Sequence, residues 1–422
     1  MTVAKKLGKY LKENLDNPEK VYKTLLRAFR VQYYIFKVAK KKEIPKSLRY
    51  LNVIGMKYML EPLKKPENSV FVNIFMPTEI LHAFGLKPLQ IEGMSSFLSG
   101  AWCEDSFVDI AESKGLSDTL CSYHKTFLGA SFAKVIPKPL CAVTTTSACD
   151  ANVNTFRALA DLYQVEQYII DVPYELSERN IAYVAEQLEE LVECLERNTG
   201  KKFRLERLKE VLEIENETLR YYKHYLKALE TKNFPNSLHA EMSKVLALQV
   251  GLGRKESLKF FRLLAQDIEK QPSIEAKYRI LWVHILPFYS ESLGEIFNFS
   301  KKYQLLLSDM NVDYLEPLDS SKPFEALAKK LIRSHYNGHF SRRAENIIEY
   351  AKKLGADGII NFSHWGCKES GGASLLLKEY LERENIPLLT IEGDGVDRRN
   401  SQEGQNRTRI EAFFEMLEKR AK

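Results

Sequence analysis

The feature that most constrains the fold of this chain is a recurring pair: a short β-rich run followed directly by helix-starting sequence. Such runs fall into two groups on either side of a long helical stretch. The first group covers residues 69–75, 88–91, 140–146 and 167–172, and the second covers 278–285, 305–307, 358–362 and 387–392. Strands that alternate with helices are typical of parallel α/β sheets. The sequence therefore predicts two α/β lobes.

The remaining segments have helical patterns. Residues 1–65 carry apolar side chains at helical spacing, with Asn17-Pro18 separating two helices. Residues 174–272 continue as amphipathic helices. We therefore expect an N-terminal helical arm (1–65), a first α/β lobe (66–173), a helical bridge (174–272) and a second α/β lobe (273–422).

Composition limits the possible partners. The 422 residues are 45% hydrophobic and 28% charged, as in ordinary globular proteins. The net charge of +6 is modest and the densest basic tract, residues 37–49, is short, so we expect no nucleic-acid partner. No signal-like segment or membrane-length apolar run is apparent. We expect a cytoplasmic protein without a membrane partner.

Three of the six cysteines, Cys121, Cys149 and Cys367, stand where an apolar run gives way to a helix start. In open α/β sheets such positions lie at the carboxyl ends of strands, where these folds build their sites. A thiol at a helix start is also easier to deprotonate for metal binding. The chain has no Cys-x-x-Cys pair, so a local zinc or ferredoxin motif is not expected. The pattern predicts a metal or cluster site assembled across the fold.

Five ordered motifs resemble those of the 2-hydroxyacyl-CoA dehydratase and benzoyl-CoA reductase superfamily, over residues 70–422. They are Pro-Thr-Glu-Ile-Leu-His-Ala-Phe-Gly at 77–85, Leu-Cys-Ser-Tyr at 120–123, Ser-Ala-Cys-Asp at 147–150, His-Trp-Gly-Cys at 364–367, and Asp394 with residues 408–415. The resemblance implies two flavodoxin-like lobes with an iron–sulfur cluster between them, held by Cys121, Cys149 and Cys367. It also implies that a separate ATP-hydrolysing iron–sulfur activator dimer supplies the electrons.

Polar residues near these motifs suit cluster chemistry. Three thiolates leave one corner of a cubane open to substrate or solvent. Groups expected to donate hydrogen bonds to cluster sulfurs are Ser122, Ser147, Ser363, Gly371 and Gly372. The residues expected at the reacting centre are His82, Glu79, His124 and His364. The imidazoles of the three histidines are expected to donate protons. Considered alone, Glu79 and His82 are better explained as a helix-capping acid and a partly buried imidazole.

The cysteine count bears on the type of cluster. Six thiols match a double-cubane [8Fe-9S] cluster, in which each cubane takes three thiolates, so Cys103 and Cys194 become further candidate ligands. Considered alone, Cys194 is better explained as a core cysteine at the edge of the apolar face of its helix. Cys141 begins the strand that Cys149 follows, and eight extended residues span more than ~20 Å, so we expect Cys141 to be a buried apolar thiol.

On this basis we expect an iron–sulfur reductase with a double-cubane cluster, working as a homodimer with its activator on small inert molecules. The first alternative is a 2-hydroxyacyl-CoA dehydratase subunit that acts on acyl-CoA through a single [4Fe-4S] cluster. The second alternative is a non-catalytic electron-storage or scaffold protein. The iron content per chain separates the three.

Overall fold

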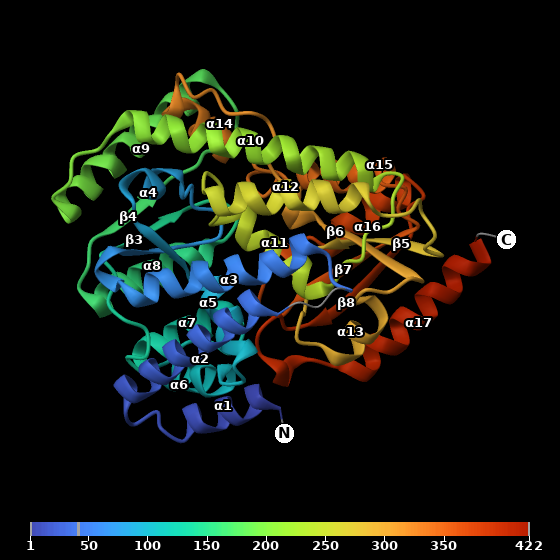
Figure 1. Ribbon diagram of the computed structural model, residues 1–422, viewed down its shortest axis with the longest axis horizontal. Coiled ribbons are helices and arrows are strands. Elements are labelled where there is room, and N and C mark those ends of the chain that lie inside the picture. Colours follow the sequence, from blue (N-terminus) through green and yellow to red (C-terminus); the bar gives the residue numbers. More distant parts are fainter. Residues whose placement is uncertain (1, 40–42, 421–422) are drawn as a thin grey trace.

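The computed structural model of the chain describes residues 2–39 and 43–420, so residues 40–42 of the basic tract lie outside the described part. Two four-stranded sheets are present, and all their neighbouring strands are parallel (Figure 1). The first sheet has the order β2 (Lys87–Gln90), β1 (Ser69–Val72), β3 (Cys141–Thr145), β4 (Gln167–Ile170). The second has the order β6 (Tyr303–Ser308), β5 (Tyr278–Val283), β7 (Gly358–His364), β8 (Leu388–Gly393). Both follow the flavodoxin-like order. The predicted fold, two parallel α/β lobes, is confirmed.

The central strands of the first sheet are buried on both faces. Val70, Val72 and Val143 pack into one apolar cluster, whereas Phe71 and Ala142 pack into another. Alternate side chains of a strand point to opposite faces, so both faces must be covered by helices. The helices of this lobe are α4 (Glu79–Phe84), α5 (Ile91–Gly100), α6 (Glu104–Ser113), α7 (Ser122–Phe132) and α8 (Asp150–Tyr163).

The second lobe repeats this plan. Its helices are α13 (Glu291–Phe297), α14 (Pro323–Arg333), α15 (Phe340–Lys353), α16 (Ser374–Arg383) and α17 (Glu403–Arg420). A π-helical turn, η3 (Lys368–Gly372), directly follows the loop after β7. Such turns are rare and occur often at functional sites.

Between the two sheets the chain forms four helices, α9 (Glu178–Thr199), α10 (Leu205–Leu229), α11 (Leu238–Gln249) and α12 (Lys255–Glu269). Ser177 caps α9 by accepting from the Asn180 N–H, and Gly200 ends the helix in the left-handed conformation. Helix α10 lies along α12 and also touches α4 and α14, as Figure 1 illustrates. The helices of the expected bridge therefore contact both lobes. The exact segment boundaries stay a prediction.

The N-terminal residues form α1 (Val3–Lys12), α2 (Pro18–Val38) and α3 (Lys46–Lys64). Helix α3 packs against α11 and α12, and most of its apolar side chains are fully buried. It is therefore part of the protein core rather than a projecting arm. In the described part of the chain, no helix combines the length and the apolar character that crossing a membrane requires.

Candidate metal centre between the lobes

Cys121, Cys149 and Cys367 meet between the two lobes, and each is half-buried. Cys121 precedes α7, Cys149 follows β3 and precedes α8, and Cys367 follows β7 and precedes η3. Burial raises the pKa of the Cys121 thiol, and the neighbouring Cys367 and Cys149 raise it further. The pKa of Cys149 is raised to about 12, by burial and then by Cys367. Three thiols distant in sequence thus share one electrostatic environment.

Each thiol also stands at the start of a helical turn, where backbone N–H groups favour negative charge. The backbone N–H groups of Ala151 and Asn152 lower the pKa of Cys149, opposite to the effect of burial. The backbone N–H groups of Ser370 and Glu369 likewise lower the pKa of Cys367. Burial outweighs this effect at both thiols. The thiols therefore stay protonated until a metal cation displaces their protons.

A histidine faces each of the three sulfurs. His364 Nε2 lies 3.2 Å from Cys121 Sγ, His124 Nε2 lies 3.7 Å from Cys149 Sγ, and His284 Nε2 lies 3.6 Å from Cys367 Sγ. The Gly395 N–H donates to His364 Nδ1 at 3.0 Å, so in the neutral ring the proton sits on Nε2 and points at Cys121. Burial lowers the pKa of His124 to about 4, and burial also lowers the pKa of His284 and of His364 below the usual value for an imidazole. Burial therefore favours the neutral form of all three imidazoles.

The backbone around the thiols is held in unusual conformations. Ala148 has φ 63° and His284 has φ 73°, although neither is glycine. Non-glycine residues rarely adopt such angles, and they cluster at functional sites. Gly366 has φ 75°, and a Cβ there would lie 2.7 Å from both Cys121 N and Thr119 O. The loop that carries Cys367 can therefore pack on the Cys121 backbone only because residue 366 has no side chain.

Gly366→Ala is expected to lower the free energy of unfolding by about 2 kcal/mol, because the new methyl group meets backbone and a left-handed φ is costly for alanine. Chemical denaturation measures this effect, and iron analysis is expected to show reduced metal content. Gly404→Ala is the control, because its Cβ meets nothing within 4 Å. Equal stability of the two variants would contradict the close approach.

Asp394, fully buried beyond β8, ties the second lobe to the start of α7. Its Oδ1 accepts from Ser122 Oγ at 2.5 Å, from the Val396 N–H at 2.8 Å and from the Asp397 N–H at 2.9 Å. The Ser122 hydroxyl is thereby committed to Asp394. Ser147 Oγ is buried without a hydrogen-bond partner among the described residues, so it is free to donate to a bound group.

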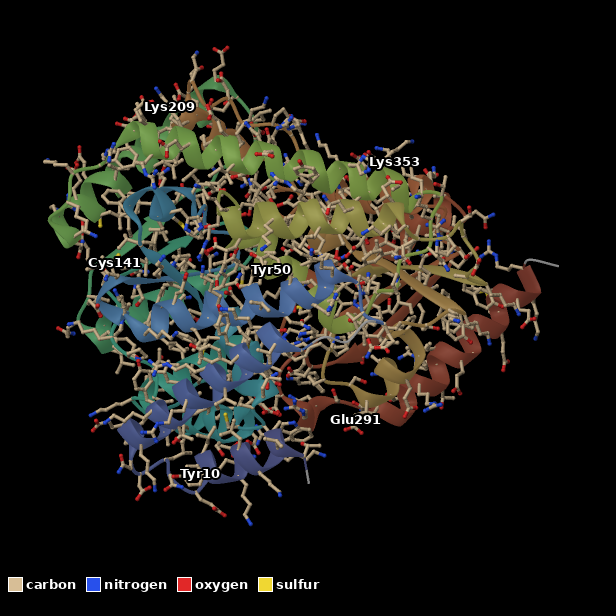
Figure 2. All side chains as sticks on the ribbon, viewed as in Figure 1. Tyr10, Tyr50, Cys141, Lys209, Glu291 and Lys353 are labelled. Atoms are coloured by element: carbon tan, nitrogen blue, oxygen red, sulfur yellow. The ribbon has the colours of Figure 1, made fainter. Side chains whose placement is uncertain are left out.

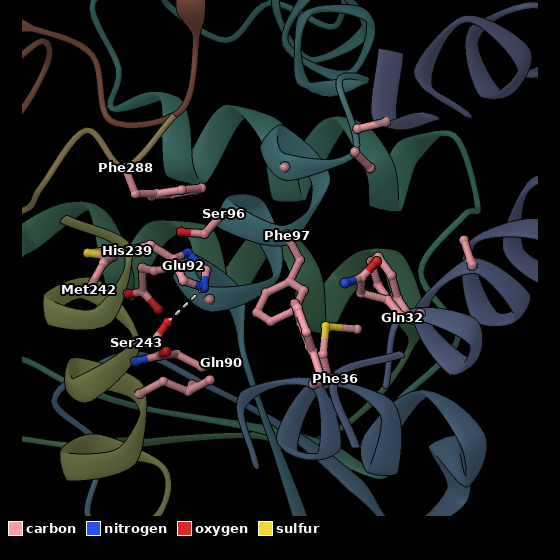
Figure 3. Close-up of a pocket in the computed structure, with 18 of the residues that line it drawn as sticks. Gln32, Phe36, Gln90, Glu92, Ser96, Phe97, His239, Met242, Ser243 and Phe288 are labelled. Atoms are coloured by element: carbon pink, nitrogen blue, oxygen red, sulfur yellow. Dashed lines mark hydrogen bonds between the residues drawn. The ribbon is translucent and has the colours of Figure 1, made fainter. Parts of the chain in front are cut away.

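A cavity of about 490 Å³ is lined by residues of α1, α2, α5 and α11 (Figure 3). Glu92, in the first turn of α5, lines it and accepts from the Ile74 N–H at 3.3 Å. Burial raises the pKa of Glu92 to about 7, and its charge in turn adds to the raised pKa of Cys149. Ser96 also lines the cavity, next to Tyr123, whose ring centroid is 5.4 Å from that of His364. Two lining residues, Glu92 and Ser96, therefore connect the cavity to the surroundings of Cys149 and of His364.

Residues 73–417 match the family model described as 2-hydroxyglutaryl-CoA dehydratase, D-component. The chain belongs to this D-component family. It is 22% identical over 407 residues to the (R)-phenyllactyl-CoA dehydratase alpha subunit of Clostridium sporogenes, covering 90% of this chain and 97% of the relative. It is 23% identical to the (R)-2-hydroxyisocaproyl-CoA dehydratase alpha subunit of Clostridioides difficile, covering 82% and 89% of the two chains. Identity to a benzoyl-CoA reductase subunit of Thauera aromatica is 24%, covering 74% and 79%. The resemblance inferred from the motifs is confirmed.

Two residues of the D-component motif at 77–85 lie elsewhere than we expected. Glu79 pairs with Lys330 Nζ at 2.6 Å, and His82 Nε2 lies 2.8 Å from the Val250 carbonyl oxygen. Strand β1 ends at residue 72, so α4 begins six residues beyond the sheet edge and turns these side chains toward other helices. The described contacts connect neither residue to the three thiols. The expectation that they reach the reacting centre gains no support from this placement.

The other three cysteines of this family member also lie away from the centre. Cys103 is in the first-lobe core and donates to the Leu98 carbonyl at 3.4 Å. Cys141 begins β3, near the outer edge of the first lobe (Figure 2), and its charge interactions are with Cys194 on α9 and Glu166. The structure thus brings together three thiols, not the six that a double cubane requires. This arrangement argues against Cys103 and Cys194 as ligands.

Three of the residues expected to donate hydrogen bonds to cluster sulfurs, Ser363, Gly371 and Gly372, differ in exposure and in hydrogen bonding. The Gly371 N–H already donates to the Cys367 carbonyl at 2.9 Å, within the π-helical turn. Gly372 is exposed, and Ser363 is half-buried beside Gly371. Ser147 is therefore the best placed of the five.

The residue types at this centre fit an iron–sulfur cluster. In the described part of the chain, no three His, Cys, Asp or Glu side chains form a group that could hold a single metal ion. Soft thiolates at helix starts, neutral N–H donors beside them and the unpaired Ser147 hydroxyl are the surroundings that such a cluster requires.

Glu92 and His284 were not among the residues predicted from the sequence. Glu92 follows the strand-like run at 88–91, and His284 directly follows β5, as Cys367 follows β7 by a short loop. The criterion that selected the cysteines, a chemically active residue just after an apolar run, would have found Glu92. It would have missed His284, because the run expected at 278–285 includes this residue, whereas β5 ends at Val283.

Proposed function

We propose that this chain is the cluster-bearing subunit of an acyl-CoA dehydratase or reductase, with one [4Fe-4S] cluster held by Cys121, Cys149 and Cys367. The observation that carries the proposal is the meeting of these three thiols at helix starts, each faced by an imidazole nitrogen within 3.7 Å. The apolar cavity that Glu92 lines supports an organic substrate, and the charge of Glu92 acts on Cys149.

A single cluster is preferred to the double cubane that the cysteine count favoured. Cys141 and Cys194 lie near one another, and Cys103 lies in the first-lobe core, so they offer no second set of three thiols at this site. A small-molecule reductase with an [8Fe-9S] cluster therefore becomes the second candidate. A non-catalytic storage protein is disfavoured because the apolar cavity would then have no use.

When bound, the cluster would supply low-potential electrons and an open iron corner. The chain's own residues prepare its surroundings. The His364 N–H is aimed at Cys121 Sγ, which favours the more negative sulfur of a reduced centre. Glu92, with a pKa near 7, can hold or release a proton at the cavity wall. The apolar walls exclude water from the reacting region.

We further propose that electrons come from an ATP-hydrolysing iron–sulfur activator dimer, in the cytoplasm. The relatives named above are alpha subunits of acyl-CoA dehydratases and one subunit of a benzoyl-CoA reductase. This supports an assembly with a second subunit, which is either another copy of this chain, as we expected from sequence, or a related chain.

Iron and acid-labile sulfide analysis of the anaerobically purified protein tests the proposal. We expect about four irons per chain, with reduction to a paramagnetic state that electron paramagnetic resonance detects. A value of about eight would favour the double cubane, and none would leave the scaffold alternative.

Glu92→Gln is expected to stabilise the protein at pH 8 while lowering its activity. The pKa of Glu92 is about 7 when folded and about 4.5 when exposed, so the folded protein binds the extra proton between these values. The contribution of Glu92 to the free energy of unfolding is therefore fully present below pH 4.5 and is lost as the pH rises through 7. The free energy of unfolding falls by up to about 3 kcal/mol over this range, and the glutamine variant should recover this loss. Denaturation curves at pH 5 and pH 8 measure it, and an equal effect at both pH values would contradict the assignment.

A further inference from the structure

The cavity that Glu92 lines is walled partly by the N-terminal helices, which lie outside the family match at 73–417. Helix α1 contributes Val3, Ala4 and Leu7, and α2 contributes residues between Ala28 and Phe36. Helix α1 is held close to the first lobe, because a Cβ at Gly8 would lie 2.2 Å from the Trp102 carbonyl oxygen. The shape of the cavity therefore depends on a part of the chain that the family pattern does not describe.

The polar groups of the cavity gather in one region. Figure 3 shows His239, Ser243, Glu92 and Gln90 together, with His239 Nε2 3.5 Å from Ser243 Oγ. The remaining wall is mostly aliphatic or aromatic, with Phe36 and Phe97 at its centre in the same view. Its other apolar members include Phe29, Ile35, Met56, Met242, Leu246 and Phe288.

The described part of this wall offers no cation to a charged ligand. Among the described residues that line the cavity, only Glu92 and His239 are ionisable, and none is Lys or Arg. Burial lowers the pKa of His239, so that ring is neutral, and Glu92 is neutral or negative. A carboxylate placed here would lose its hydration without gaining a cationic partner, which is unfavourable.

We infer that the cavity binds acyl groups with an apolar chain, branched aliphatic or aromatic, and rejects acyl groups that carry a second carboxylate. This inference rests on the proposed acyl-CoA function. The volume of about 490 Å³ is ample for such a chain, since a cavity of about 150 Å³ already accepts benzene. The helices α1 and α2 are then specificity-determining elements of this chain.

The test is calorimetric binding to the cluster-loaded protein of four thioesters: (R)-phenyllactyl-CoA, (R)-2-hydroxyisocaproyl-CoA, lactoyl-CoA and (R)-2-hydroxyglutaryl-CoA. We expect the first two to bind about tenfold or more tighter than the last two. Ala28→Phe, which adds a ring at the cavity wall, should remove this advantage and leave lactoyl-CoA binding unchanged. Ala182→Phe, on the exposed face of α9, is the matched control and should behave as the unmodified protein.

The outcomes are distinct. Binding of 2-hydroxyglutaryl-CoA as tight as that of the apolar thioesters would overturn the inference and leave the proposed function standing. Equal losses in Ala28→Phe and Ala182→Phe would overturn the assignment to this cavity. If no thioester binds while iron and sulfide are at full content, both the inference and the acyl-CoA part of the proposed function fail.

Discussion

Cys367→Ala is expected to lose its cluster and its activity while keeping the fold. A cubane held by three thiolates has no spare protein ligand, and Cys367 is the one that the second lobe provides. Removing a residue that hydrogen-bonds to a metal ligand typically lowers metal affinity by about 10–100-fold. Removing the ligand itself should therefore lower the affinity for the cluster by more than about 100-fold. The side chain is only half-buried in a loop, and the free energy of unfolding of the metal-free protein should change by less than about 1 kcal/mol. Iron analysis and denaturation measure the two effects.

Cys194→Ala and Cys141→Ala are the matched controls. Both thiols are buried in the first half of the chain, away from the centre, so their loss should lower stability modestly and leave iron unchanged. Full iron in Cys367→Ala would refute the three-thiol centre. Iron halved by Cys194→Ala would instead restore the double cubane.

The two lobes and two of the three central thiols, Cys149 and Cys367, follow from local sequence. Each depends on a strand followed by a helical turn, and in a parallel sheet this alternation fixes both the fold and the edge at which the following residue lies. Cys121 precedes α7 but follows α6 rather than a strand, so the expectation that it stands at a strand end was wrong. Cys141 begins β3 and Cys149 lies four residues beyond its end, before α8, so the order expected along this segment is observed.

The cavity that Glu92 lines and the histidine contacts do not follow from local sequence. From the sequence we expected residues 1–65 to form a helical arm. Only tertiary packing shows that α1 and α2 line the cavity beside Glu92. The contact between Cys121 and His364 joins residues 243 positions apart. Such pairings depend on how the two lobes dock, which the periodicity of either lobe does not encode.

Glu79 illustrates why a motif residue can mislead. Its side chain and that of Glu215 both lie 2.6 Å from Lys330 Nζ, and each carboxylate is almost fully buried. The three residues come from α4, α10 and α14, so they connect the first lobe, the bridge and the second lobe. Burial and the neighbouring Glu79 raise the pKa of Glu215 to about 8. At Glu79, burial opposes ionisation but Lys330 outweighs it and lowers the pKa.

Lys330→Met is therefore expected to destabilise the protein by about 3–5 kcal/mol, because it leaves the Glu79 carboxylate buried without its cation. Denaturant unfolding at pH 7 measures the loss. The neighbouring Lys329→Met is the control; among the described residues Lys329 makes no ion pair, so its effect should stay within about 0.5 kcal/mol.

The double variant Glu79→Gln with Lys330→Met separates charge from packing. Removing both charges should recover much of the loss, since no unpaired buried ion then remains. If the double variant is as unstable as Lys330→Met, packing rather than charge pairing holds these helices together. If Lys330→Met is as stable as the unmodified protein but inactive, the motif glutamate acts in the reaction after all, and its place between the lobes is not structural.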